Sequence, residues 1–303
     1  METPMLFLIF NRPETTYKVF KKIKNVKPKK LYIAADGPRE NNINDKVNCK
    51  KARGVINKID WDCEVKTLFR DKNLGCKLAV SSAIDWFFEN EEMGIIMEDD
   101  CLPDQTFFYF CEELLNKYEN DKRIMMIAGT NFLFSSHDLE ESYFFSYYYP
   151  IWGWATWRRA WNFYDIEMKG WKEFKLKNLL KHYYDDSDMV NYVESMLEAT
   201  YEGKINSWDL QWVYTCLKQN GLSIIPKNNL ISNIGAIGTH MGNENIHNFL
   251  KTKAIDKIIH PKYIYPNDKY NKILFDKILN RNLSLKSKII RIFKRVLAKI
   301  KIK

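Results

Sequence analysis

The stretch Ile95-Ile96-Met97-Glu98-Asp99-Asp100 joins a short apolar run directly to three carboxylates. An apolar run of this length, bounded by polar residues, predicts a buried β-strand. In an open α/β sheet, ligands bind at the carboxyl ends of the strands, which is where these acids stand. Oxygen ligands favour a hard cation such as Mg²⁺ or Mn²⁺. A solvated acidic turn explains the same triplet, because short motifs recur by chance, so the surrounding sequence has to decide.

Strands and helices alternate on both sides of this stretch. The expected strands are 5–10, 31–35, 64–69, 94–97 and 124–128, and the expected helices are 14–26, 46–59, 77–88 and 107–118. Such alternation predicts a doubly wound, mostly parallel sheet with helices on both faces. After residue 130 the pattern weakens. There we expect a tryptophan-rich loop at 150–157, mostly helix over 176–201, a helix that opens with 207–212 and runs to about 219, and a strand at 222–226.

Positive charge is concentrated at the C-terminal end of the chain. The 303 residues carry a formal net charge of +9, and residues 285–303 contain eight lysines and arginines but no acid. The remainder is close to neutral, which argues against a nucleic-acid partner. Apolar residues recur at helical spacing in 285–303, so we expect a basic amphipathic helix on an anionic membrane surface. Packing of this helix against the body is the alternative.

The sequence carries no signal for secretion or for membrane crossing. It has no run of about 18 apolar residues, and no basic segment precedes its first apolar run. Its six cysteines form no CxxC pair, which argues against a zinc site and suits reduced thiols. We therefore expect a cytoplasmic protein, peripheral on the inner face of the cell membrane. The predicted divisions are one domain at 1–250, a linker or helical extension at 251–284 and the basic tail at 285–303.

Polar side chains follow the expected strands. Asn11 and Arg12 follow the first strand, Asp36 follows the second, and Asn73 lies in the loop after the third. Because the ends of parallel strands meet at one edge of a sheet, we assign these residues to one ligand site with the acidic triplet. Asp36 is expected to accept a hydrogen bond from a base N–H, and a turn aspartate is the alternative. No GxGxxG or GxxxxGK[ST] motif is present, which argues against a dinucleotide or P-loop fold.

Two residues further along the chain are candidates for chemistry. Asp209 follows Trp208 at an expected helix start, where it is either an N-cap or a general base. In the second case Trp208 and Trp212 would desolvate it and raise its pKa. His240 lies in the glycine-rich segment 235–242, where it is either a structural or exposed residue or a metal ligand that closes over the site.

The stretch Trp152-Gly153-Trp154 also has two interpretations. Indoles clustered in sequence are either part of the core or an apolar floor on which the C–H faces of a sugar pack.

In combination, these motifs resemble glycosyltransferases of the GT-A fold, over roughly residues 4–242. Glu98-Asp99-Asp100 stands at the position of the metal-binding DXD motif, in the Glu-Asp-Asp form of the N-acetylglucosaminyltransferase I-like enzymes. Trp152-Gly153-Trp154 and Trp208-Asp209 resemble the Trp-Gly-rich and Trp-Asp segments of those enzymes. The chain also resembles bacterial family 2-like transferases. The expected fold is therefore a Rossmann-like mixed sheet with an added C-terminal amphipathic helix.

The later part of the chain shares a further motif with these enzymes and departs from it at one position. Ile225-Pro226 followed by residues 235–242 resembles their Arg-Pro-Glu strand and glycine turn. Lys227 stands where the family has an acid.

The resemblance implies a metal-dependent inverting glycosyltransferase of bacterial surface glycan synthesis. It would move a sugar from a nucleotide diphosphate sugar, UDP-linked, to a hydroxyl of a glycan or lipid-linked acceptor, with Mn²⁺ or Mg²⁺ as cofactor. Asp209 would be the base. The implied donor-binding residues are Asn11, Arg12, Asp36, Asn73, Glu98 and Asp99. The implied acceptor-binding residues are Trp152, Gly153 and Trp154, and the implied metal ligands are Asp99, Asp100 and His240.

Two other functions remain open at this point. One is a sugar nucleotidyltransferase, although that class needs a glycine-rich phosphate loop after its first strand, and Phe10-Asn11-Arg12-Pro13 is not one. The other is a non-catalytic protein that binds membrane surfaces through residues 285–303.

Overall fold

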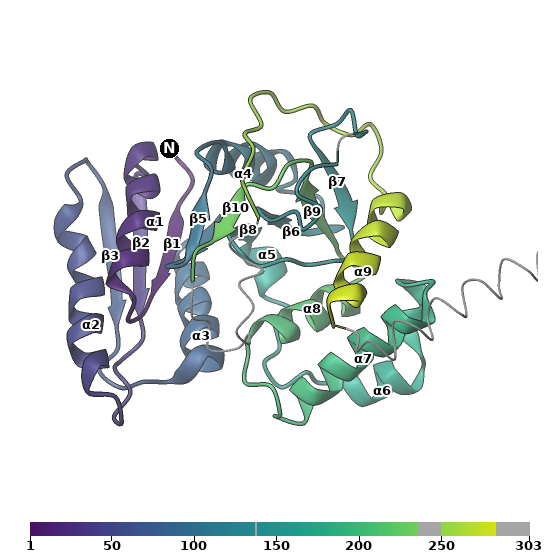
Figure 1. Ribbon diagram of the computed structural model, residues 1–303, viewed down its shortest axis with the longest axis horizontal. Helices are drawn as coiled ribbons and strands as arrows, with labels where there is room; N and C mark the ends of the chain where they lie inside the picture. The colour runs from purple at the N-terminus through teal and green to yellow at the C-terminus, as the bar shows by residue number, and fades with distance from the viewer. Residues whose placement is uncertain (137, 236–249, 283–303) are drawn as a thin grey trace, which may run out of the picture.

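The computed structural model describes residues 1–136, 138–235 and 250–282, and it confirms the mixed α/β class with helices flanking one large sheet (Figure 1). The predictions for His240 and for the tail at 285–303 lie outside the described residues. Within the described ranges, no helix combines the length and the apolarity that crossing a bilayer requires.

The large sheet has eight strands in the order β3-β2-β1-β4-β8-β6-β9-β7. Its strands are β1 (Met5–Ile9), β2 (Lys30–Ala35), β3 (Glu64–Phe69), β4 (Met93–Glu98), β6 (Ile124–Ala128), β7 (Tyr143–Ser146), β8 (Trp154–Trp157) and β9 (Leu222–Pro226). The four strands from β3 to β4 are parallel neighbours, and β6 is parallel to β9. Strand β8 runs antiparallel to both of its neighbours, and β7 runs antiparallel to β9. A separate ladder pairs β5 (Cys101–Pro103) with β10 (Ile231–Asn233).

Helices cover both faces of the sheet because successive strand residues point to opposite sides. In β1, Met5, Phe7 and Ile9 join one core cluster, whereas Leu6 and Leu8 join the other. The first cluster is closed by α1 (Pro13–Val26), α2 (Ile43–Arg53) and α4 (Thr106–Lys117). The second is closed by α3 (Gly75–Asn90), α5 (Arg158–Trp161), α6 (Trp171–Leu176), α7 (Ser187–Tyr201), α8 (Asp209–Lys218) and α9 (Asp268–Asn282). Two 3₁₀ helices, η1 (Gly54–Lys58) and η2 (Leu179–His182), complete the described elements.

Most expected elements are present, and the helix boundaries differ where side chains cap the ends. Helix α2 begins before the expected residue 46 because the Asn42 side chain accepts a hydrogen bond from the Asn44 N–H at 3.1 Å. The segment 176–201, expected to be mostly helical, contains η2 and α7 with a break between them. Helix α7 begins only at Ser187, where Asp186 accepts a hydrogen bond from the Asp188 N–H at 2.8 Å.

The prediction of a loop across 150–157 is wrong for its second half. Residues 154–157 form β8, which lies between β4 and β6 in the middle of the sheet. All four of its residues are buried. The side chain of Trp154 belongs to one core cluster, and that of Trp157 belongs to the other. These indoles therefore pack into the core on opposite faces of a central strand and do not lie on the surface.

The chain returns to the body after residue 250. Backbone N–H groups of this segment donate to Asn229 O (from Lys253, 2.9 Å) and to Thr106 Oγ1 (from Ile255, 3.2 Å). Helix α9 then packs against α7 and buries Tyr270 and Phe275 in the core. Figure 1 shows this segment as the yellow-green loop that runs along the top of the view, past β7, before α9.

Candidate active site

The carboxyl ends of β1, β2 and β4 meet at one edge of the sheet, as the sequence predicts. In the parallel register Leu8 lies opposite Glu98, and Ile9 lies opposite Ala35. Residues that follow these strands, among them Arg12, Asp36 and the acidic triplet, therefore emerge from adjacent strand ends. This edge is where open α/β sheets bind ligands.

Asp99 is buried and ties β4 to the loop after β1. Its Oδ2 accepts hydrogen bonds from the Phe10 N–H at 3.1 Å and from Thr16 Oγ1 at 3.4 Å. Its Oδ1 lies 3.5 Å from the Arg12 guanidinium. Burial raises the pKa of Asp99 to about 6, although the charge of Arg12 opposes the rise. One oxygen of Asp99 thus holds the backbone, and the other faces the site.

Asp100 is enclosed by a cation on one side and by backbone on the other. The Arg12 Nη1 donates to Asp100 Oδ2. The Ile234 N–H donates to the backbone carbonyl of Asp100 at 2.7 Å, which brings Gly235 against the carboxylate. A Cβ atom at Gly235 would lie only 2.5 Å from Asp100 Oδ2. A side chain at residue 235 would therefore force either the Asp100 carboxylate or the chain at this position to shift.

Glu98 has a buried carboxylate oxygen, Oε1, for which the described residues provide no hydrogen-bond partner. Burial, followed by the charges of Asp100, Asp99 and Asp209, raises the pKa of Glu98 to about 8. A buried polar atom without a partner is uncommon in a native protein and marks a candidate ligand contact. A hydroxyl group of a ligand would satisfy this oxygen.

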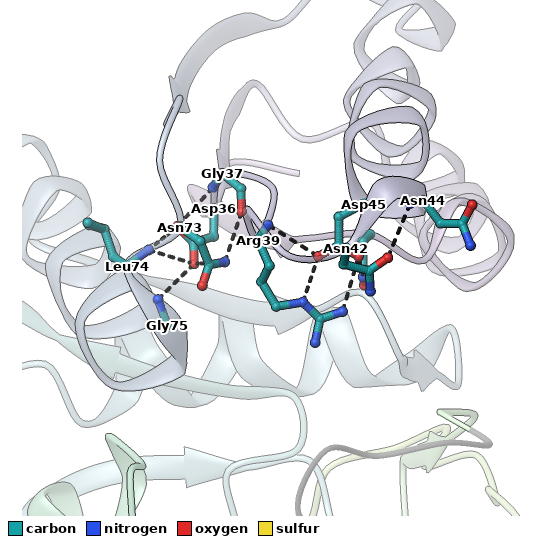
Figure 2. A network of polar contacts seen from close by, with 10 residues as sticks. Asp36, Gly37, Arg39, Asn42, Asn44, Asp45, Asn73, Leu74 and Gly75 are labelled. Atoms are coloured by element: carbon teal, nitrogen blue, oxygen red, sulfur yellow. Dashed lines mark hydrogen bonds and ion pairs between the residues drawn. The ribbon is translucent and has the colours of Figure 1, made fainter.

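The carboxylate of Asp36 is already used for hydrogen bonds within the protein. Its oxygens accept hydrogen bonds from the backbone N–H groups of Leu74 (2.9 Å) and Gly75 (3.1 Å) and from Asn73 Nδ2 (2.9 Å). Figure 2 shows Asp36 beside Asn73, Leu74 and Gly75, at the start of α3. Asp36 and Asn73, both predicted to bind the sugar-nucleotide donor, are thus hydrogen-bonded to each other. Asp36 also caps the start of α3, the helix that follows β3. The structure favours the alternative of a structural aspartate for these contacts.

Asn11 belongs to a second polar network, also visible in Figure 2. Its Nδ2 donates to Asp45 Oδ1 at 2.7 Å, and Asp45 is 1% exposed. Arg39 Nε donates to Asp45 Oδ2 at 2.6 Å, and its guanidinium lies 5.6 Å from the centre of the Phe10 ring. The hydrogen bond from Arg39 lowers the pKa of Asp45. This network fixes the loop after β1 against α2 and so positions the neighbouring Arg12.

Asp209 is the first residue of α8, and Trp208 occupies the N-cap position without a capping side chain. The alternative in which Asp209 itself is the N-cap is therefore wrong. Ser207 Oγ donates to the Asp209 carboxylate. The charge of Asp209 contributes to the raised pKa of Glu98, which places the two carboxylates in one electrostatic environment. Desolvation and the charges of Glu98, Asp209 and Asp36 also raise the pKa of the Cys76 thiol to about 12.

A cluster of tryptophans determines where α8 begins. Trp208 stacks on Trp154 with ring centres 5.7 Å apart, and Trp212 lies 5.7 Å from the same ring. The Tyr164 hydroxyl donates to the carbonyl of Trp208 at 3.1 Å. Because the rings on α8 and β8 are buried together, they fix the helix start, and with it Asp209, relative to the sheet.

The predicted acceptor floor is divided by the fold. Trp154 has no exposed surface, so its indole lies in the core and cannot contact an acceptor in this structure. Trp152 is half-buried and packs edge-on against Phe132 at 5.1 Å. Gly153 has a φ of +56°, and a Cβ atom there would lie 2.5 Å from the Ile231 side chain. Trp154 is therefore corrected to a core residue, and the acceptor prediction rests on Trp152 and Gly153.

The carboxylate oxygens of the acidic triplet are ligand atoms of the kind that a hard divalent cation prefers. Asp99 and Asp100 present carboxylate oxygens next to a group that is already cationic, the Arg12 guanidinium. Among the residues that the structure describes, no group of three or more His, Cys, Asp or Glu side chains is arranged to hold a metal. The described residues would supply one or two carboxylates, which is typical of Mg²⁺ bound together with substrate phosphates, and the predicted ligand His240 lies outside the described residues. Asp100, with Asp99, would hold the ion.

Two contributors to this site, Asp45 and Arg39, carry no recognisable signal in the sequence, and for Gly235 the sequence shows only that it begins a glycine-rich segment. Asp45 and Arg39 lie on and before a helix whose other charged residues are mostly exposed, and only the folded structure turns Asp45 inward. Gly235 lies 135 positions after Asp100, and the pairing of β10 with β5 brings them together.

No protein-family model and no curated protein sequence matches this chain. Among solved structures, TarS from S. aureus (residues 1–349) is similar with a TM-score of 0.42 and 7% identity, over 76% of this chain. The chain spans 59% of the length of that TarS fragment. UDP-glucose pyrophosphorylase is similar in its apo form (TM-score 0.38) and in complex with UDP-glucose (0.39), each at 11% identity over 78% of this chain and 94% of the other. These similarities concern the general arrangement of strands and helices.

Proposed function

We propose that this protein is a metal-dependent inverting glycosyltransferase that uses a nucleotide diphosphate sugar. The observation that carries the proposal is the meeting of Asp99, Asp100 and Arg12 at the carboxyl edge of the sheet, with Asp209 acting on Glu98 from α8. A carboxylate pair suited to a cation, a guanidinium suited to phosphate and a further carboxylate for proton transfer form the set that such a reaction needs.

In the proposed reaction, the residues of this chain bind, orient and take up a proton. Arg12 and the loop after β1 bind the diphosphate, and Glu98 accepts a hydrogen bond from a sugar or ribose hydroxyl. When bound, Mn²⁺ or Mg²⁺ neutralises the charge that develops on the leaving diphosphate. Asp209 takes the proton of the acceptor hydroxyl. The acceptor oxygen bonds to the anomeric carbon as the bond from that carbon to the diphosphate oxygen breaks, and the electron pair leaves with the nucleotide.

The finer assignments belong to the same proposal. The donor is UDP-linked, and the acceptor is a glycan or a lipid-linked molecule of bacterial surface glycan synthesis. Residues 285–303 would keep the protein at the inner face of the cell membrane. The sugar nucleotidyltransferase is the alternative, and the loop between β1 and α1 argues against it, because this loop contains no glycine and is occupied by contacts of Phe10 and Arg12 with the acids.

The test is the variant Asp209→Asn, which keeps the size of the side chain and removes its capacity as a base. We expect calorimetry to show unchanged binding of UDP in the presence of MnCl₂, while release of UDP from a panel of UDP-sugars with acceptor falls by about 100-fold or more. Asp62→Asn, at an exposed turn, is the matched control. Full activity of the Asp209→Asn protein would remove Asp209 from the role of base.

A further inference from the structure

The Arg12 guanidinium lies where the acidic pair would hold a cation. Its Nη1 donates to Asp100 Oδ2 and is 3.5 Å from Asp99 Oδ1. The Asp99 and Asp100 side chains are only 9% and 13% exposed, whereas that of Arg12 is 32% exposed. Two carboxylates buried side by side repel each other strongly unless a positive charge lies between them. In this structure Arg12 provides that charge.

Both oxygens of Asp100 already have neighbours in this structure. Arg12 contacts Oδ2, Gly235 lies so close to Oδ2 that a methyl group would not fit, and the Cys101 thiol donates to Oδ1 at 3.5 Å. The second oxygen of Asp99 is committed to the Phe10 N–H and to Thr16. A divalent ion bound to the inward-facing oxygens of both residues therefore needs the place that the guanidinium now fills.

Helix α1 does not depend on the side chain of Arg12. It is the N-cap residue of α1, but its side chain makes no capping hydrogen bond there. Its backbone carbonyl is the part that the helix uses, as the acceptor for the Thr16 N–H at 3.0 Å and for Thr16 Oγ1 at 2.7 Å. Rotation of the side chain away from the acids therefore costs α1 no hydrogen bond to Thr16.

We propose that Arg12 is an internal counter-cation that a divalent metal ion must displace from Asp100 and Asp99. This inference rests on the proposed function and adds that the binding of the metal depends on the binding of the diphosphate. The metal alone binds weakly, because it competes with a guanidinium that is already in place. A diphosphate favours the exchange, because Arg12, once released, pairs with phosphate oxygens. Metal and diphosphate thereby bind as a coupled pair.

The experiment measures binding of Mn²⁺ alone to the full chain by calorimetry, without nucleotide and without an activity readout. In Arg12→Gln the competing charge is gone, and we expect Mn²⁺ to bind about tenfold more tightly than to the wild type. Arg12→Lys keeps the positive charge but loses the planar guanidinium that reaches two carboxylates. We expect this variant to bind Mn²⁺ about threefold more tightly than the wild type does. Arg123→Gln, which removes an exposed arginine at the opposite edge of the sheet, is the charge-matched control and should bind as the wild type does.

The outcomes separate this inference from the proposed function. If Arg12→Gln binds Mn²⁺ no more tightly than the wild type, while Asp100→Asn loses binding, the metal site stands and the competition is refuted. If Asp100→Asn binds Mn²⁺ as the wild type does, the metal role of Asp100 in the proposed function is wrong. If Arg12→Gln fails to fold, Arg12→Lys decides, because an affinity equal to that of the wild type contradicts the proposal.

Discussion

The carboxylate of Asp36, at the end of β2, accepts a hydrogen bond from the backbone N–H of Gly75, the first residue of α3. A helix start leaves N–H groups without intrahelical partners, and here a residue from a different element satisfies them. The same contact binds the loops after β2 and β3 to each other. A Cβ atom at Gly37 would overlap the backbone of Lys72, so the two loops approach as closely as glycine allows.

Replacement of Asp36 by alanine should therefore destabilise the whole domain. We expect a loss of about 1–2 kcal/mol in the free energy of unfolding, since the cap of α3 disappears. Urea denaturation followed by circular dichroism measures this loss. Asp62→Ala, at an exposed position, is the control. An unchanged urea midpoint for Asp36→Ala would show that water replaces the carboxylate without cost.

Replacement of Gly235 by alanine should disturb the site more than the fold. The added methyl group would lie 2.5 Å from Asp100 Oδ2, so either the carboxylate or the chain after β10 has to shift. We expect binding of UDP with MnCl₂ to weaken about tenfold, which corresponds to about 1.4 kcal/mol.

Gly54→Ala is the control for this change, because Gly54 has an ordinary φ of −62° and nothing within 4 Å of the added atom. Binding by Gly235→Ala that equals binding by Gly54→Ala would mean that Asp100 is not needed for the metal–nucleotide complex.

Trp152 and Trp154 should behave differently although they are two residues apart. Trp154→Ala removes a fully buried indole from the cluster with Trp208, and we expect a loss of about 3–5 kcal/mol of stability. Trp152→Ala removes a half-buried ring, so its loss should be clearly smaller, with UDP binding retained. Urea denaturation of both variants gives the comparison. Equal losses would place Trp152 in the core and end its candidacy as an acceptor residue.

The raised pKa of Asp85 should make the stability of the protein depend on pH. This residue of α3 is exposed to solvent at its surface but accepts a hydrogen bond from Trp161 Nε1 at 2.7 Å, and partial desolvation of its carboxylate raises its pKa. The folded protein thus binds a proton on Asp85 more readily than the unfolded chain does. Its contribution to stability therefore falls as the pH rises from the ordinary aspartate value through the raised one.

Asp85→Asn keeps an oxygen for Trp161 and removes this titration. We expect the variant to gain stability relative to the wild type at neutral pH, and the gain to shrink as the pH falls through the raised pKa and then below the ordinary aspartate pKa of about 3.9, where both side chains are neutral. Urea midpoints at several pH values test this expectation. A gain that does not change with pH would mean that the carboxylate charge at Asp85 carries no cost.

The sequence predicts the first half of the fold well because its elements are local. Strands β3, β6 and β9 have the expected boundaries, and β6 and β9 are short apolar runs flanked by turn residues or helix ends. Strand β8 was missed because Trp154-Ala155-Thr156-Trp157 is buried on both faces. Such a strand shows no polar alternation and takes its place only through its neighbours β4 and β6.

By itself, the sequence determined that acids and bases follow successive strands, and the parallel arrangement then had to bring them to one edge. It did not determine what they contact there. Contacts between Arg12 and Asp100, between Asp36 and Gly75, and between Gly235 and Asp100 join positions 39 to 135 residues apart. Only the tertiary structure decides such contacts, because they depend on strand register and on the exclusion of water from neighbouring charges. Burial of the acids, which their own polar sequence does not predict, turned the triplet from three solvated carboxylates into a cluster that the Arg12 guanidinium contacts.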